Sequence, residues 1–597
     1  MDENNRNFYL ALSLSVLVFL IWHFVFVAPK QEEARLRQQQ EAALKQQKAD
    51  GAPVAPELKH AEPASPGAIV PQSAEKGRAI VLSESKRIKI DTPSLSGSLS
   101  LKGARFDDIL LVKQRQKVEK DSPPVELFSP AGTKHPFLAE FGWSGTAGTK
   151  VHLPTRETEW RLVSGDTLTP SSPITLQYKA AGGVVFEREI SIDDKFMFTL
   201  KQRVINNGSQ ALDLAPYGFI WRRNKPYSES LFISHEGAVA LMDGVLHEEA
   251  YADLVDSKPF VYKAKTGWAG ITDKYWAAAL IPDQNYGLTA TMQGDQAGKG
   301  DTYQATYLLN TQRIEPGKSL EVTNRLFAGA KQGRVIKTYE RDLNIERFED
   351  LIDWGWFAFI TKPLFYVLVY FNDIVHNFGV SILIVTVLIK LLLFPLANKS
   401  YKSMAMMKKM QPEMEKIRKR YEKDKMKQQQ ALMDLYKKEQ INPLSGCWPV
   451  LVQIPIFFAL YKVLYVTIEM RHAPFFGWIQ DLSAPDPTSI FNLFGLLPID
   501  LPVYLMLGIW PIIMGLTMWV QMKLNPEPTD PVQAKIFAYM PLVFTFVLAG
   551  FSAGLVIYWA WNNFLSIIQQ YVIMKRQGVD VPLLENIGFK KKEKPKT

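Results

Sequence analysis

The chain has 597 residues, of which 47% are hydrophobic and 22% are charged, and its formal net charge is +9. It is too long for a single domain and too polar for a protein made only of membrane helices, which indicates a large soluble domain inserted among such helices. Its single cysteine, Cys447, excludes an intramolecular disulfide and is expected to serve in packing. Lys and Arg are concentrated in residues 399–438 and 575–596; basic segments of this kind suit a cytoplasmic face, anionic lipid head groups or RNA.

The first apolar run covers residues 9–27 and is long enough to cross a bilayer. We therefore predict an N-terminal transmembrane anchor at residues 1–28. A cleaved signal peptide is the alternative, but the run is longer than a usual signal-peptide core, and Asp2 and Glu3 precede it. Residues 29–77 pass from a Gln-, Glu- and Lys-rich stretch to a Pro-, Ala- and Ser-rich one without an apolar period, which predicts a flexible periplasmic linker.

Short alternating runs fill residues 78–340, for example 185–192 and 196–204, and turn signals such as Asn207-Gly208 separate them. This pattern predicts a large antiparallel β-sandwich. The segment contains no Walker loop, no HExxH motif and no serine nucleophile elbow. Its histidines are scattered and predict neither a metal site nor a catalytic site: His135, His152, His235 and His247. We therefore expect a scaffold or binding module and no enzyme; an enzyme of sugar-mutarotase-like architecture would need convergent His and Glu residues.

Aromatic residues recur at helical spacing in residues 346–379, and Pro363 interrupts the pattern. Aromatics this dense, with Asp353 and Lys362 among them, are typical of an amphipathic helix lying in the bilayer interface. A plain membrane-spanning helix is the alternative.

The remaining apolar segments predict five more membrane helices, with transmembrane helix 2 at residues 380–397 and helices 3–6 within residues 444–574. With the anchor they make six transmembrane helices, which puts both termini on one side. The loop at 398–443 and the tail at 575–597 are basic. In contrast, the link at 473–500 contains acidic residues and neither Lys nor Arg. The positive-inside rule therefore predicts cytoplasmic termini and a periplasmic β domain.

Lys390 lies in the middle of an apolar run, where a lone ammonium costs about 2.5–3.5 kcal/mol on insertion scales. Thr386 is one turn earlier on the same helix face. We expect Lys390 to face a hydrated groove in the protein. The alternative is a lipid-facing side chain that snorkels to the interface.

Other polar residues occur in the predicted spans, and their cost in lipid predicts that they converge on one interior surface. They are Gln453, Gln521, Asn562, Asn563, Ser566 and Gln569. No Asp or Glu lies at the centre of a predicted span, which argues against ion-coupled transport. A solute transporter or channel remains the alternative function.

Residues 398–443 predict a basic helical hairpin in the cytosol. Its apolar stripe consists of Met404, Met407, Met410 and Met414, and its basic residues include Lys408, Lys409, Arg418 and Arg420. A Met-rich surface can accept varied apolar segments, so the stripe is a candidate capture surface. The alternative is that the stripe packs one arm of the hairpin on the other.

Three sequence runs carry a specific resemblance: SMAMMKKMQPEMEKIRKRY, LYKKEQINPLSGCWPVLVQIPIFFALYKVL, and AYMPLVFTFVLAGFSAGLVIYWAWNNFLSIIQQYVI. The region from Trp354 to Met574 closely resembles the YidC/Oxa/Alb insertase family of Gram-negative bacteria, and the anchor and β domain resemble that branch in layout. The resemblance implies a periplasmic supersandwich and a five-helix core with a groove open to the cytoplasm. It also implies an inner-membrane insertase and chaperone for nascent membrane proteins, working alone or with the Sec translocon, without a cofactor or small-molecule substrate.

Residue roles implied by the resemblance can be assigned position by position. Lys390 falls where the family usually has the groove Arg; Lys keeps the charge but lacks the planar fork that pairs bidentately with carboxylates. Tyr558 and Trp559 match the aromatic pair that contacts substrate helices, with Trp in place of the second Tyr. The polar groove positions match Thr386, Gln453, Asn563 and Ser566. The hairpin and the basic tail match regions that receive substrate and the ribosome.

Overall fold

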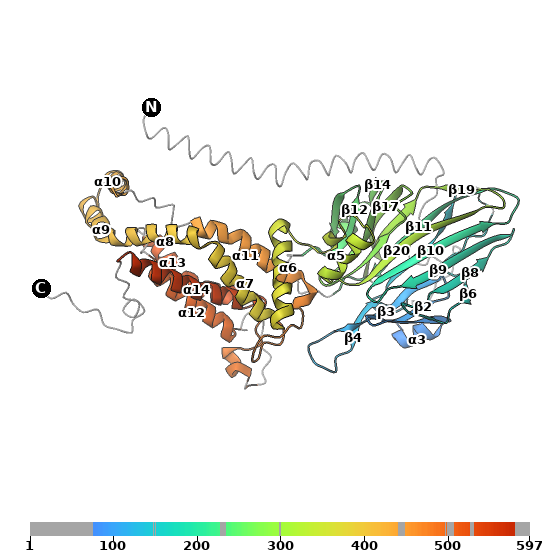
Figure 1. Ribbon diagram of the computed structural model, residues 1–597, viewed down its shortest axis with the longest axis horizontal. Helices are drawn as coiled ribbons and strands as arrows, with labels where there is room; N and C mark the ends of the chain where they lie inside the picture. Colours follow the sequence, from blue (N-terminus) through green and yellow to red (C-terminus); the bar gives the residue numbers. More distant parts are fainter. Residues whose placement is uncertain are drawn as a thin grey trace, which may run out of the picture. The chain divides into compact units, whose positions relative to one another are not determined.

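The computed structural model describes residues 76–146, 149, 151–226, 234–297, 300–439, 448–495, 497, 507–525 and 531–578. The chain forms two compact units, Met1–Leu351 and Ile352–Thr597 (Figure 1). The predicted anchor, nearly all of the predicted linker, Cys447 and most of the basic tail lie outside the described residues.

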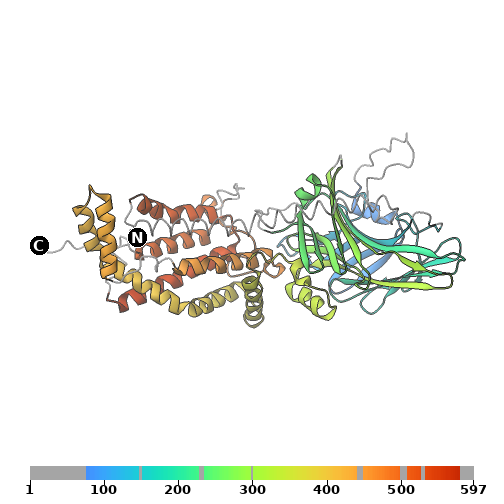
Figure 2. The same ribbon diagram turned by 90° about the horizontal axis from the view of Figure 1, so that it is seen from above.

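The described part of the first unit is built on two β-sheets that pack face to face (Figure 2). In spatial order, the larger sheet contains β14 (Phe260–Ala264), β17 (Leu288–Ala297), β18 (Gly300–Leu309), β11 (Leu212–Arg223), β5 (Phe137–Gly145), β3 (Arg105–Arg115), β2 (Leu95–Ser100), β1 (Arg87–Asp91) and β7 (Thr167–Leu168), with β19 (Gln312–Ile314) beside β11 and β4 (Pro124–Phe128) beside β3. The other contains β13 (Val245–Ala250), β12 (Gly237–Met242), β15 (Gly267–Thr272), β16 (Trp276–Ile281), β20 (Ser319–Ala330), β10 (Met197–Asn206), β9 (Val184–Ile192), β8 (Ile174–Lys179) and β6 (Arg161–Ser164). The pairing is antiparallel except between β1 and β7, and the prediction of a β-rich unit is confirmed.

In the described part of this unit, four short helices accompany the sheets: α3 (Arg78–Ser83), α4 (Tyr251–Asp256), α5 (Gly333–Asp342) and the 3-10 helix η2 (Phe348–Leu351).

Arg188 occupies an inward position of β9, where alternation otherwise places apolar side chains against the core. Its guanidinium donates hydrogen bonds to the carbonyl oxygens of Ala104 (3.1 Å) and Phe141 (2.6 Å), which belong to the facing side of the sandwich. It also lies 4.7 Å from the centroid of the Trp160 ring. Burial lowers the pKa of Arg188 to about 10, so the group stays charged at neutral pH. A single buried cation therefore ties β9 to backbone across the sandwich core.

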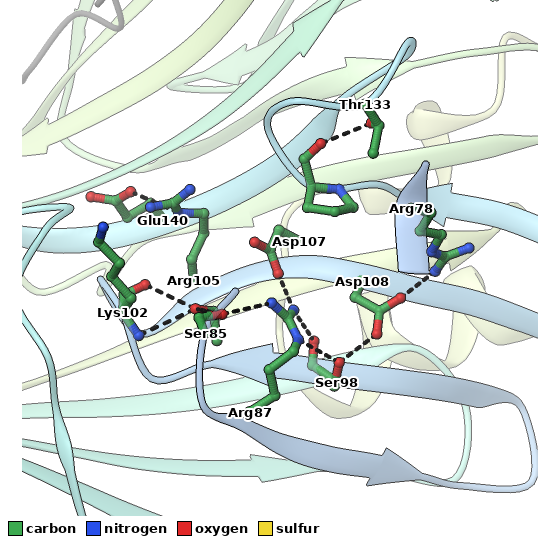
Figure 3. Close-up of polar contacts among 12 residues, drawn as sticks. Arg78, Ser85, Arg87, Ser98, Lys102, Arg105, Asp107, Asp108, Thr133 and Glu140 are labelled. Atoms are coloured by element: carbon green, nitrogen blue, oxygen red, sulfur yellow. Dashed lines mark hydrogen bonds and ion pairs between the residues drawn. The ribbon is translucent and has the colours of Figure 1, made fainter. Parts of the chain in front are cut away.

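A second polar network joins α3 to β1, β2 and β3 (Figure 3). Arg87 forms an ion pair with Asp107 and donates from Nε to the hydroxyl of Ser98 over 2.7 Å. Asp108 accepts from the Ser98 hydroxyl and pairs with Arg78. Burial raises the pKa of the Asp107 carboxyl, against the opposing effect of Arg87. Arg87, followed by Arg105, is thus the main cation that opposes the effect of burial on the pKa of Asp107.

Replacing Arg87 with Leu is expected to destabilise strands β1–β3 by about 3 kcal/mol at neutral pH, because a buried carboxylate loses its counterion. Without Arg87, the pKa of Asp107 in the folded state rises further above its value in the unfolded state. In the pH interval between these two pKa values, the folded state binds more protons than the unfolded state. Stability should therefore fall as pH rises through it, and acidification should recover stability. Hydrogen exchange of the β1–β3 amides in the intact protein measures both effects.

Arg203→Leu is the control, since Arg203 pairs with Glu321 on the surface and its loss should lower the stability by less than about 1 kcal/mol. A loss in Arg87→Leu that does not change with pH would contradict this explanation.

The second unit is helical in its described part (Figures 1 and 2). Its helices are α6 (Ala358–Val375), α7 (Phe378–Leu392), α8 (Phe394–Lys409), α9 (Gln411–Arg420), α10 (Lys425–Lys438), α11 (Trp448–Val466), η4 (Ile468–Met470), η5 (Ile490–Gly495), α12 (Ile509–Leu524), α13 (Pro531–Leu548) and α14 (Ala553–Arg576). Helix α14 lies at the centre of this arrangement, because it contacts α7, α8, α11 and α12.

The predicted count of six membrane spans is not confirmed. By length and hydropathy, one described helix could cross a membrane, α6, and the pair α7 and α8 would be a second candidate if it formed one bent span. The predicted segment 380–397 is not one straight helix, since α7 ends at Leu392, α8 begins at Phe394, and the two are bent by 67°. Pro395 falls in the first turn of α8, where its missing N–H is tolerated. The predicted hairpin boundary at Asn398 therefore lies inside α8.

Helix α6 buries one face and exposes another that is apolar. Its buried residues are Thr361, Leu364, Phe365, Leu368 and Val369, whereas Phe359, Tyr370 and Ile374 are exposed. Lys462 of α11 pairs with Asp353, just before α6, over 2.6 Å. The position of α6 in the bilayer interface stays a prediction.

Asp486 organises the loop that precedes α12. It is 1% exposed and accepts hydrogen bonds from the indole N–H of Trp478, the backbone N–H and hydroxyl of Thr488, and the backbone N–H of Trp510. The last of these caps the first turn of α12, where a carboxylate also complements the helix dipole. A Cβ at Gly508 would lie 2.5 Å from the Asp486 carboxyl carbon, so the close approach needs glycine there.

Asp486→Ala is expected to cost about 3 kcal/mol locally, because it leaves buried donors without an acceptor. The amides at the start of α12 should then exchange about a hundredfold faster in the detergent-purified protein. Asp481→Ala is the matched control: Asp481 accepts hydrogen bonds from the backbone N–H and the hydroxyl of Ser483, and its loss should leave α12 protected. If amide exchange at the start of α12 were accelerated equally in both variants, the hydrogen bonds to Asp486 would not be what stabilises that end of the helix.

Candidate functional site

Lys390 contacts a neighbouring helix. Its ammonium donates a hydrogen bond to the Ser566 hydroxyl of α14 over 2.7 Å. The Ser566 hydroxyl donates in turn to the backbone carbonyl of Asn562 over 2.8 Å. Trp561 adds a second link between the same helices, from its indole N–H to the carbonyl of Leu383. The cation in α7 is therefore held against α14.

Gln453 extends this network to a third helix. Its amide nitrogen donates to the Tyr558 hydroxyl (3.0 Å) and to the Asn562 side-chain oxygen (2.8 Å). Asn562 thus accepts from Ser566 with its backbone and from Gln453 with its side chain. The result is a hydrogen-bonded path from Lys390 through α14 to α11, which we call the polar path: Lys390, Ser566, Asn562, Gln453 and Tyr558.

The other predicted groove residues are buried beside this path. Thr386 is buried and donates to the carbonyl of Ile382 in its own helix (2.6 Å). Asn563 is buried, and its amide nitrogen has no partner among the described atoms. The sequence placed both residues among the converging polar positions and gave the groove role to Asn563, whereas the structure puts Asn562 at the junction. Helical spacing could not have distinguished the two, because both lie about one turn before Ser566 and both spacings make neighbours on a helix.

Tyr558 and Trp559 occupy different surroundings. Tyr558 is 1% exposed. Its contact with a substrate helix stays a prediction. The Trp559 ring is partly buried, with its centroid 4.3 Å from that of Phe457 and 6.4 Å from that of Phe544. Trp559 packs against the cluster Met514, Leu548, Val556 and Ala560.

A cavity of about 340 Å³ lies between α7, α8 and α14, and Lys390 is part of its wall. The wall consists of Val387, Lys390, Leu391, Phe394, Asn398, Leu565, Ile568, Gln569, Val572, Ile573, Arg576 and Gln577. Gln453, Asn562 and Asn563 are not among these residues. Lys390 is therefore the member of the polar path that also lines this crevice.

Two predicted capture lysines bind helix ends. Lys408 donates to the carbonyl of Leu524 at the end of α12 (3.3 Å), and Lys409 donates to the carbonyl of Gln577 just after α14 (2.6 Å). Cations at these positions satisfy terminal carbonyls and complement the helix dipole. Arg418 accepts at its backbone carbonyl from Gln428 of α10. The Arg420 guanidinium is 5.9 Å from the Tyr421 ring.

The predicted methionine stripe is largely covered. Met414 is 6% exposed, and its sulfur lies 4.0 Å from the hydroxyl of Tyr436 on α10. Met404 packs against Ala397, Tyr401 and Ile573, and Met407 and Met410 are half-buried. The exposed methionines of the hairpin are Met406 (44%), Met426 (73%) and Met433 (48%). The sequence could not identify them, because only the fold shows which faces of α8 and α10 are covered by other helices.

Comparisons with known proteins match both units. Residues 87–367 match the family model described as the YidC periplasmic domain, and residues 370–579 match the model described as 60Kd inner membrane protein. The membrane protein insertase YidC of Methylobacterium radiotolerans is 51% identical, over 98% of this chain and 97% of that protein. The chain belongs to the YidC family of membrane protein insertases. The YidC of Brucella suis biovar 1 is also 51% identical, over 100% of this chain and 99% of that protein.

Among solved structures, a crystal structure of an active YidC insertase aligns with 81% of this chain and 92% of its own, at 18% identity and a TM-score of 0.35. The matched YidC-family models identify the β-rich unit as the periplasmic domain and the helical unit as the inner-membrane part.

Met414→Ala is expected to loosen the α9–α10 packing of this YidC-family hairpin by about 2 kcal/mol, because it leaves a cavity at a buried contact. Amides of α9 and α10 should exchange about 30-fold faster. Met426→Ala, at an exposed position, should leave their exchange unchanged. If the two variants behave alike, Met414 does not hold the hairpin together.

Proposed function

We propose that this chain inserts and folds nascent membrane proteins in the bacterial inner membrane, and that Lys390 supplies the charge that draws them in. The observation that carries the proposal is the polar path. A cation and four polar residues from three apolar helices form one hydrogen-bonded chain. Polar groups are costly among membrane helices, so their concentration marks a functional surface.

The positive charge of Lys390 attracts acidic residues in the short extracytoplasmic part of a client. The groove around it, with Thr386, Gln453, Asn563 and Ser566, hydrates the client backbone and shortens the apolar distance that the client must cross. Lys390 donates to a neutral acceptor, the Ser566 hydroxyl. A client carboxylate can outcompete that hydroxyl, because charge-assisted hydrogen bonds to an ionised acceptor are stronger.

The client then slides past Tyr558 and Trp559 into lipid. Burial of about 20 apolar residues supplies the free energy. The membrane potential assists acidic tails that move outward, by about 2.3 kcal/mol per charge per 100 mV. Neither ATP hydrolysis nor bond chemistry is required.

We further propose the topology and partners that this mechanism needs. Six transmembrane helices place both termini and the hairpin in the cytoplasm, as the distribution of Lys and Arg supports. The hairpin and basic tail receive the client from the ribosome, and the chain works alone or beside the Sec translocon. Capture uses the exposed methionines Met406, Met426 and Met433 together with the half-buried members of the stripe.

Lys390→Ala should slow insertion of a small client with an acidic tail at least about tenfold, corresponding to about 1.4 kcal/mol, since one charge pair near a protein surface is worth about 4 kcal/mol at 4 Å. Lys390→Arg should insert normally. The measurement is protease protection of the client in reconstituted vesicles. A client whose tail acids are changed to amides is the control and should be indifferent to Lys390→Ala. Equal insertion of the acidic client by wild type and Lys390→Ala would refute the electrostatic step.

A further inference from the structure

The crevice between α7, α8 and α14 has the size of a small-ligand site. Its volume is about 340 Å³, at the lower end of the range for ligand pockets. A client segment of 20 residues is about 30 Å long and about 10 Å across, so it does not fit. A slender apolar chain does.

The wall of the crevice is amphipathic along its length. The α7–α8 side presents Leu391 and Phe394, and the α14 side presents Ile568 and Val572; all four are exposed in the structure. Apolar side chains lining an open crevice in a membrane helix unit favour an acyl chain. Amide side chains lie among and beside them: Gln569 in α14, Gln577 just after α14 and Asn398 in α8.

The charge toward the C-terminal end of α14 is positive. Arg576 is in the wall, and none of the twelve wall residues is acidic. Arg576 forms no recorded ion pair with any described residue, whereas the Lys390 ammonium already bonds Ser566. Ser566 and Arg576 are ten residues apart on α14, or about 15 Å along the helix axis. The crevice therefore has a cationic end and an apolar length comparable to part of a lipid tail.

We propose that this crevice binds one anionic phospholipid. Its phosphate is held by the Arg576 guanidinium, which suits phosphate oxygens geometrically, with the amides of Asn398 and Gln577 as further donors. Its acyl chain lies against Leu391 and Ile568 toward Lys390.

The chain offers a matched control for the head group. Lys575 is adjacent to Arg576 and carries the same charge, but it is not in the wall; its ammonium lies 5.9 Å from the Tyr571 ring. General attraction of a membrane surface depends on both cations alike and is screened by salt. Binding in the crevice depends on Arg576.

The experiment uses full-length protein in detergent micelles with equal amounts of phosphatidylglycerol and phosphatidylethanolamine. Native mass spectrometry counts the lipids that remain bound after a high-salt wash. We expect wild type to retain one phosphatidylglycerol in preference to phosphatidylethanolamine.

Arg576→Gln should lower the retention of phosphatidylglycerol about tenfold. Lys575→Gln should not change it. Ile568→Trp, which fills the apolar part and keeps every charge, should also lower it. Circular dichroism checks that each variant keeps its helices.

Equal losses in Arg576→Gln and Lys575→Gln would show surface attraction and overturn the proposal. Unchanged retention in Ile568→Trp would place the lipid elsewhere. If deletion of residues 1–28 raised phosphatidylglycerol retention above that of the full-length protein, the first segment of the chain would be the occupant of the crevice. That result would also overturn the proposal.

Discussion

The helical unit depends on one requirement: an ammonium among apolar helices must have partners. Lys390 finds its partner on α14, 176 residues later in the chain, and that pairing fixes α7 against α14. Asn562 then uses both of its oxygens, one for Ser566 and one for Gln453, so that α11 joins the same assembly. Such links between helices are individually modest in a membrane, but they are directional, which apolar packing is not.

Charge also sets the ends of the helices. Asp486 accepts from the first turn of α12, and Lys408 and Lys409 donate to the last carbonyls of α12 and to the residue after α14. Acid at an N-terminus and base at a C-terminus both agree with the helix dipole. The hairpin lysines therefore fasten α8 to the bundle, and this role is separate from any contact with a client or ribosome.

Much of this architecture could be predicted from the sequence, because alternation and polarity are local signals. The alternation in β9 identified a strand, and the cost of a charge in lipid identified Lys390. What could not be predicted depends on which surfaces meet. The inward position of Arg188, the choice of Asn562 over Asn563, the break at Leu393 and the burial of Met414 all follow from tertiary neighbours. The number of membrane spans stays a prediction, since it depends on segments outside the described residues and on whether α7 and α8 are counted as one span.

The three exposed methionines give the hairpin a chemical sensitivity. Oxidants convert accessible thioethers to sulfoxides, which are polar and chiral, and they reach Met426 before the buried Met414. Oxidation would therefore remove apolar character from the outside of the hairpin while leaving its internal packing intact. Sulfoxide reductases could reverse that loss, so the outer surface of the hairpin would be repairable without refolding.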